Sequence, residues 1–178
     1  YFDQGMYSWN HLAGAAMERY GADRLTIPVE LNEREIRDSG VQGEMIVYGY
    51  LPMMISAQCI RKTTLGCSGK SEIMWLKDRK DMRFPVVNQC RFCYNTIYNS
   101  APLSLLGLSE QVTGLKPNAV RLNFTVEEPA AAGEILDAFF EEYGMSEKAA
   151  EPPVLRNQFT RGHFTNTVAS SYPLLWQE

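Results

Sequence analysis

The amino-acid sequence predicts an α/β fold in which helices alternate with the strands of a parallel sheet. Segments rich in β-branched and aromatic residues predict three strands, at residues 24–30, 44–50 and 119–126. Helical spacing of apolar residues and capping residues predict three helices, at residues 8–20, 33–38 and 131–143. Short links join the elements of the first 50 residues. This alternation of strands and helices is typical of parallel strands with crossover helices.

Local signals place the ends of these elements. Ser8 can cap the first helix and Gly21 can stop it. Pro28 has no amide hydrogen for a ladder, so the first strand is expected to end or become irregular there. Asn32 is expected to cap the second helix, and Gly144 to end the last one. The last helix has one apolar face, made of Ile135, Leu136, Phe139 and Phe140.

Three strands are too few to close an eight-stranded barrel. The fold is therefore either a small open sheet or the C-terminal part of a TIM-like barrel whose first half is absent. Because the chain begins at Tyr1 and not at Met, we favour the barrel. A half-barrel exposes apolar strand edges and helix faces, so we expect association with the missing N-terminal barrel half or self-association.

The regular rhythm stops for roughly seventy residues, whereas a normal connection has about 2–6. Inside this insertion, residues 71–76 and 84–87 are expected to form a hairpin around a turn at 77–81, and 104–108 a helical turn. The predicted organisation has four parts. Residues 1–50 form barrel strand–helix units, and residues 51–118 form the cysteine-rich insertion. Residues 119–150 form the last barrel strand and helix, and residues 151–178 form an irregular tail.

Composition and charge restrict the class of protein. The 178 residues are enough for one domain with a sizeable core. The net charge of −4 does not give the chain as a whole the basic field of a nucleic-acid-binding protein. No apolar run approaches a membrane span and no signal-peptide pattern is visible, so we expect a cytoplasmic protein without a membrane partner.

All the cysteines of the chain lie in the insertion, at Cys59, Cys67, Cys90 and Cys93. The last two are three residues apart and can direct their sulfurs into one pocket, and the first two can complete a four-thiolate shell. Such a shell suits tetrahedral zinc or an iron–sulfur cluster, and the spacing does not separate the two. The alternatives are two disulfides or four buried thiols. Because disulfides are typical of oxidising compartments and small chains, we favour a metal site.

Five separated motifs occur in the chain. The longest reads VYGYLPMMISAQC, from Val47 to Cys59. The others are Ile27–Leu31, Trp75–Arg79, Phe84–Val86 and Phe159–Phe164. In content and order these motifs resemble the collagenase-like peptidase family, family 32 of the peptidases of unassigned mechanism. The chain departs from the commoner family pattern at Tyr48, where many members have His, and at Pro52, where many have Cys.

The resemblance implies a TIM-like barrel of which this chain covers the last strands and the cysteine insertion. Family members were named as proteases with collagenase-like activity, so it implies a protease, a hydrolase acting on protein or peptide. Other members act in RNA base hydroxylation or quinone biosynthesis, and some hold a 4Fe–4S cluster on four cysteines. The alternative function is therefore a cluster-dependent enzyme of RNA modification or related redox chemistry. By this analogy the cofactor is a 4Fe–4S cluster or zinc, with ligands Cys59, Cys67, Cys90 and Cys93.

Four further residues are candidates for catalysis. Glu30, Tyr48 and Glu127 each end a predicted strand, and in a barrel function collects at the C-terminal strand ends. Either carboxylate can act as a general base or bind a substrate amine or hydroxyl, and Tyr48 can donate a proton or a hydrogen bond. His163 is expected to reach the barrel mouth or the cluster. The alternatives are solvated carboxylates, a packed tyrosine and a structural loop histidine.

The residues themselves supply no protease mechanism, because the chain has no HExxH or GxSxG motif and no cysteine outside the expected ligand set. A third hypothesis is that the cysteine module is a purely structural staple. The insertion is locally basic, which suits an RNA backbone or another anionic substrate, although such a run is more often a solvated face. Its basic residues are Lys62, Lys70, Lys77, Arg79, Lys80, Arg83 and Arg91.

Overall fold

The computed structural model describes residues 1–144 and 158–165, and within them the strands form two sheets. The first sheet is mixed, in the order β6-β1-β7, with β1 (Glu44–Gly49), β6 (Leu103–Ser104) and β7 (Ala119–Asn123). The second is antiparallel, in the order β2-β5-β4-β3, with β2 (Pro52–Ser56), β3 (Ile73–Lys77), β4 (Arg83–Gln89) and β5 (Tyr94–Tyr98). The helices are the 3-10 helix η1 (Gln4–Met6), α1 (His11–Arg19), α2 (Glu33–Ser39), α3 (Ile60–Leu65), α4 (Ser109–Gly114) and α5 (Pro129–Glu142).

The predicted C-terminal part of a TIM-like barrel is wrong, because most strands are antiparallel. Strand β1 pairs with β6 in antiparallel register, Tyr48 opposite Ser104. The insertion forms its own sheet of hairpins, and short turns can join only antiparallel neighbours. The segment predicted as the first strand forms only isolated parallel bridges, of Leu25 with Phe2 and Thr26 with Glu44, before it reaches Pro28.

Several local predictions are confirmed. Asn32 caps α2 in a full capping box with Glu35, each side chain accepting a backbone amide hydrogen of the other residue. The hairpin of β3 and β4 forms around residues 77–81, with Trp75 opposite Pro85. Two local predictions were wrong. Asn10, not Ser8, caps α1. Residues 104–108 do not form a helical turn, because Ser104 is the last residue of β6 and the residues after it are not helical.

The chain divides into two compact units in the part that the structure describes. Unit 1 contains residues 1–47, 107–121 and 161–165. Unit 2 contains residues 48–106, 122–144 and 158–160. Residues 145–157 and 166–178 lie outside the described residues. They include the end of the predicted part 119–150 and most of the predicted tail.

Unit 1 is held by a small apolar cluster and one arginine. Ala22, Leu25 and Val41 are buried together, with Phe2 and Met17 packed against them. The Arg121 guanidinium lies 2.6 Å from Asp3 and 2.8 Å from Glu44, so it ties the N-terminal segment to β1 and β7. Burial alone would raise the pKa of Asp3, but the hydrogen bond from Arg121 holds it below its ordinary value.

The apolar stripe of α1 is largely exposed. Leu12 is 69% exposed and Tyr20 is 85% exposed, and only Gly14 of this helix is buried. Exposed apolar side chains of this size are typical of surfaces that a partner covers. The association expected from a half-barrel stays a prediction, although the half-barrel itself is wrong. No helix among the described residues has the length and apolar character needed to cross a membrane.

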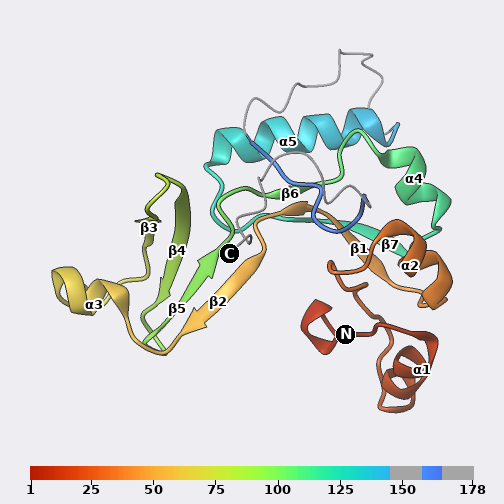
Figure 1. The fold of residues 1–178 in the computed structure, drawn as a ribbon, viewed down its shortest axis with the longest axis horizontal. Helices are drawn as coiled ribbons and strands as arrows, with labels where there is room; N and C mark the ends of the chain where they lie inside the picture. The colour runs from red at the N-terminus through yellow and green to blue at the C-terminus, as the bar shows by residue number, and fades with distance from the viewer. Residues whose placement is uncertain (145–157, 166–178) are drawn as a thin grey trace, which may run out of the picture. The chain divides into compact units, whose positions relative to one another are not determined.

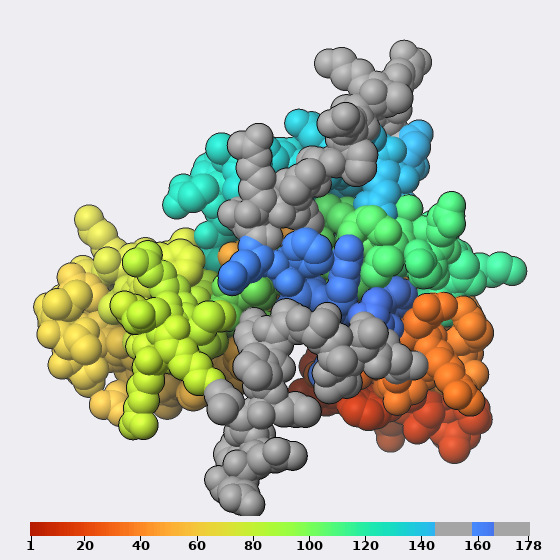
Figure 2. Space-filling model, turned by 45° about the horizontal axis from the view of Figure 1, so that its top comes forward, coloured from red at the N-terminus to blue at the C-terminus, as the bar shows by residue number. Residues whose placement is uncertain are grey.

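Unit 2 is built around the antiparallel sheet, with α3 beyond one end of it (Figure 1). Residues 52–98, coloured yellow to yellow-green, form one continuous body in the space-filling view (Figure 2). Val86, Asn88 and Asn95 are fully buried in this sheet. In the same unit the ends of β1 and β7 approach so closely that a Cβ atom on Gly49 would lie 2.5 Å from the Asn123 carbonyl oxygen.

Candidate functional site

All four cysteines come from one end of the antiparallel sheet. Cys90 and Cys93 begin and end the four-residue turn between β4 and β5, and Cys93 takes the left-handed conformation with φ 56° that closes the turn. Strand β2 ends beside the start of β5, with Ser56 opposite Asn95, and Cys59 follows three residues later. Cys67 lies in the loop that leads into β3. The first residue of β3, Ile73, pairs with Val87 near the end of β4.

The four cysteines line one pocket, although they are spread over 35 positions of the sequence, 59 to 93. Its other lining residues are Lys62, Asn88, Gln89 and Tyr94. The cavity itself is small, with a volume of about 30 Å³. Cys67 and Cys93 are exposed and Cys59 and Cys90 are half-buried, and all four are free thiols. The site is therefore accessible to an ion or cofactor from solution.

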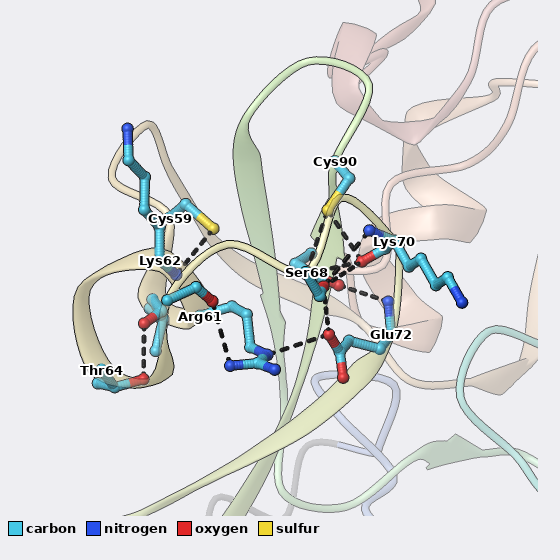
Figure 3. A network of polar contacts seen from close by, with 11 residues as sticks. Cys59, Arg61, Lys62, Thr64, Ser68, Lys70, Glu72 and Cys90 are labelled. Atoms are coloured by element: carbon cyan, nitrogen blue, oxygen red, sulfur yellow. Dashed lines mark hydrogen bonds and ion pairs between the residues drawn. The ribbon is translucent and has the colours of Figure 1, made fainter.

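Neighbouring backbone and amide groups position two of the sulfurs. The Cys59 Sγ accepts a hydrogen bond from the Lys62 backbone amide at 3.4 Å, at the first turn of α3. The Cys90 Sγ donates to the Lys70 carbonyl at 2.9 Å. Figure 3 shows Cys59 beside Lys62 and Cys90 beside the loop that carries Ser68 and Lys70, with the ion pair of Arg61 and Glu72 close by.

Asn88 connects the sheet to this loop. Its side chain is fully buried, and its Oδ1 accepts a hydrogen bond from the Glu72 amide at 2.5 Å. Its Nδ2 donates to the Lys70 carbonyl at 3.3 Å and lies 3.5 Å from the Cys90 Sγ. The buried Asn88 side-chain amide thus fixes the loop between Cys67 and β3 against the end of β4. The sequence analysis did not identify Asn88, because a single asparagine does not indicate a metal site.

The electrostatics of Cys90 show that the four sulfurs share one environment. Desolvation raises the pKa of the Cys90 thiol, and negative charge on Cys67, Cys59 and Cys93 raises it further. Among residues 1–144 and 158–165, however, no three His, Cys, Asp or Glu side chains are grouped closely enough to hold a single metal ion. Four cysteine side chains thus line one pocket, but in the described part of the chain they do not form a group that could hold one metal ion.

A second cluster of predicted residues lies in unit 2. Burial raises the pKa of Tyr48, and the nearby charge of Glu127 raises it further. Tyr50 and Tyr98, which the sequence analysis did not single out, have their pKa values raised by burial and by the same carboxylate. The Tyr48 ring also contacts Phe124, with ring centroids 5.7 Å apart. The structure therefore brings Tyr48 and Glu127 together, within a group of aromatic rings.

The other two predicted residues, Glu30 and His163, belong to unit 1. Glu30 is half-buried in the turn before α2, and its Oε2 atom has no hydrogen-bond partner among the described residues. His163 is exposed in a turn next to Phe164, whose carbonyl accepts the Glu33 amide at the start of α2. The Arg161–Phe164 segment thus has a visible packing role in unit 1.

Comparison of the chain with protein-family models, with curated proteins and with solved structures finds no match. The resemblance to the collagenase-like peptidase family therefore stays a prediction from the motifs. The function has to be argued from the pocket and its surroundings.

Proposed function

We propose that the four cysteines hold a 4Fe–4S cluster, and that the protein is a cluster-dependent enzyme acting on RNA or a related aromatic, anionic substrate. The observation that carries the proposal is the single pocket lined by Cys59, Cys67, Cys90 and Cys93. A four-thiolate set of this kind binds either a 4Fe–4S cluster or zinc. When bound, the cluster supplies one-electron chemistry, and the chain supplies the thiolates and the substrate surface.

A single zinc ion and a 4Fe–4S cluster require different spacings of the four sulfurs. With Zn–S bonds of about 2.3 Å, the sulfurs of a tetrahedral site lie about 3.8 Å apart. No three candidate ligands in the described part of the chain are grouped for one ion. In a 4Fe–4S cluster each thiolate binds a different iron, so its sulfurs stand further apart around a shared pocket.

Aromatic and basic side chains beside the pocket support a nucleic-acid substrate. Phe92, in the turn between two of the cysteines, is 66% exposed. Its ring is stacked with Tyr94 at 6.3 Å, and the Arg91 guanidinium lies over it at 5.4 Å. Exposed rings with neighbouring cations stack single-stranded bases and attract their phosphates. Lys62 adds a positive charge at the pocket itself.

The peptidase activity implied by the family resemblance has no comparable support. A cysteine nucleophile requires a base such as histidine, and none of the residues that line the cysteine pocket is a histidine. The cysteines are also the whole of the proposed ligand set. Peptide hydrolysis therefore stays a prediction from the motifs alone.

The test of the cofactor is metal and sulfide analysis of protein purified without oxygen. We expect about four irons and about four acid-labile sulfides per chain, with broad visible absorption typical of iron–sulfur proteins. Zinc at one ion per chain, without sulfide, would replace the redox function by a structural role. Four free thiols with neither metal would refute the proposal.

The substrate surface is tested by RNA binding. Replacing Phe92 with Ala is expected to weaken binding of a single-stranded RNA oligonucleotide by about 1–3 kcal/mol, because one stacking platform is lost. The matched control is Phe140→Ala in α5, a residue that is 38% exposed and lies away from the turn in sequence. Fluorescence anisotropy measures both. Equal affinity of the Phe92 variant and the wild type would exclude stacking at this turn.

A further inference from the structure

Two buried asparagines lie opposite each other beside the cysteine turn. Asn88 in β4 pairs with Asn95 in β5, so their side chains share one face of the antiparallel sheet. Asn88 stands two residues before Cys90, and Asn95 stands two residues after Cys93. Both asparagines are 0% exposed. A buried amide group is costly unless it is hydrogen-bonded, so the partners of each side chain indicate its role.

Asn88 holds the loop that follows Cys67. Its Oδ1 accepts a hydrogen bond from the Glu72 amide at 2.5 Å, and its Nδ2 donates to the Lys70 carbonyl at 3.3 Å. The same Nδ2 also donates to the Cys90 Sγ at 3.5 Å. Both ends of this buried amide are therefore used on the loop after one cysteine and on the sulfur of another.

Asn95 holds the segment that leads to Cys59. Its Nδ2 donates to the Gln58 carbonyl at 2.7 Å, one residue before the cysteine. Ser56, which pairs with Asn95 across β2 and β5, donates its hydroxyl hydrogen to the same carbonyl at 3.2 Å. The Asn95 Oδ1 is buried and has no hydrogen-bond partner among the described residues. Because an apolar side chain would avoid the cost of this oxygen, packing alone does not account for an asparagine here.

We propose that Asn88 and Asn95 are positioning residues of the cysteine site. Asn95 fixes the chain before Cys59. Asn88 fixes the loop after Cys67 and contacts the sulfur of Cys90. Three segments that are separate in the sequence are thereby held so that their cysteines line one pocket. The effect of the two asparagines on a cluster rests on the proposed function, but the positioning of the cysteine segments does not.

The two asparagines are expected to affect a bound cluster differently. Asn88 donates to a ligand sulfur, and such a donor stabilises the more negatively charged reduced form, which raises the reduction potential. Asn95 donates to a backbone carbonyl, which is not a cluster ligand. Replacement of either residue is therefore expected to loosen the site, but only replacement of Asn88 is expected to shift the potential.

The first test is hydrogen exchange of the full, metal-free chain in the variants Asn88→Leu and Asn95→Leu. Leucine has the same branching of heavy atoms as asparagine but forms none of these hydrogen bonds. We expect Asn88→Leu to speed exchange several-fold in residues 68–72 and to leave residues 57–63 unchanged. We expect Asn95→Leu to do the reverse. A variant that merely weakened the fold would speed exchange in both segments and throughout the sheet.

The matched control for hydrogen exchange is Thr96→Val. Thr96 is buried in the same strand as Asn95, and as the adjacent residue it directs its side chain to the opposite face of the sheet. This variant is expected to exchange as the wild type does in both segments. If a leucine variant does not fold, Asn88→Ser or Asn95→Ser replaces it, because serine is small and too short to reach the same partners.

The second test uses the reconstituted chain. Iron release to a chelator is expected to be about tenfold faster or more in both leucine variants, in line with the loss of an outer partner of a metal ligand. Only Asn88→Leu is expected to shift the reduction potential, to a more negative value. Unchanged exchange of both segments in the folded variants would overturn the proposal, whether or not the wild type binds a cluster. The expected exchange pattern with no iron in the wild type would refute the proposed function and support the positioning role.

Discussion

Replacing any one of the four cysteines with serine is expected to remove most of the bound iron and the visible absorption. Each thiolate is expected to bind a different iron of one cluster, and a serine hydroxyl is a poor substitute for it. Loss of even an outer partner of a metal ligand costs about 10–100-fold in affinity, so loss of a ligand is expected to cost more than about 100-fold. The variants are Cys59→Ser, Cys67→Ser, Cys90→Ser and Cys93→Ser, measured by iron content after anaerobic reconstitution.

The fold itself is not expected to depend on these thiols. Two of the cysteines are exposed and two are half-buried, so a serine in their place leaves little apolar surface uncovered. Thr64→Ala in α3 is the matched control, because Thr64 is exposed, does not line the pocket and donates its hydroxyl hydrogen to Ile60 of its own helix. It is expected to retain the cluster. If one cysteine variant keeps full iron and sulfide, that residue is not a ligand and the four-thiolate assignment fails.

Replacing Gly49 with Ala is expected to lower the free energy of unfolding by about 3 kcal/mol or more. Gly49 has φ 150°, and such a backbone conformation costs a residue with a side chain about 1–3 kcal/mol. In addition, the new Cβ would lie 2.5 Å from the Asn123 carbonyl oxygen, and this backbone atom cannot rotate away. A chain of this size loses about 2–4 °C in melting temperature per kcal/mol, which thermal unfolding readily measures.

Gly133→Ala is the matched control for this prediction. Gly133 lies inside α5, has open space where the Cβ would be, and is exposed. Alanine is about 1 kcal/mol more favourable than glycine in a helix, so this variant is expected to be slightly more stable than the wild type. If Gly49→Ala unfolds at the wild-type temperature, the strand ends beside Tyr48 and Phe124 are not packed as described.

The sequence was sufficient where a local signal decides the structure. Asn32 was expected to cap the second helix, and α2 begins there, with Glu35 completing a reciprocal cap. The hairpin of β3 and β4 follows from two apolar segments around a polar turn. The cysteines gathered in the insertion line one pocket. That they bind a metal ion or a cluster stays a prediction.

The sheet topology could not be predicted, because it depends on pairing between distant segments. Strand β2 begins at Pro52 and exposes most of its side chains, so its pattern lacks the buried face that marks a strand in a sequence. Strand β5 follows the cysteine turn, where the sequence suggested ligands and not a hairpin. Without these two strands, the helix–strand rhythm at each end of the chain indicated a parallel barrel.

The carboxylate–tyrosine cluster was predicted in part. Tyr48 and Glu127 were candidates because each ends a predicted strand, and they do lie together. Tyr98 was missed because it lies on a strand that the sequence analysis did not predict. The expectation that Glu30 joins them rested on the barrel, which the sheet topology contradicts.

The most direct test of the central claim is X-ray absorption at the iron edge of the anaerobically reconstituted chain. The account predicts iron coordinated by sulfur alone, with iron–iron scattering at short range, because four cysteines and the cluster sulfides supply every ligand. Iron coordinated by oxygen or nitrogen, without an iron neighbour, would contradict it. In that case the four cysteines would share a pocket without forming a cluster site.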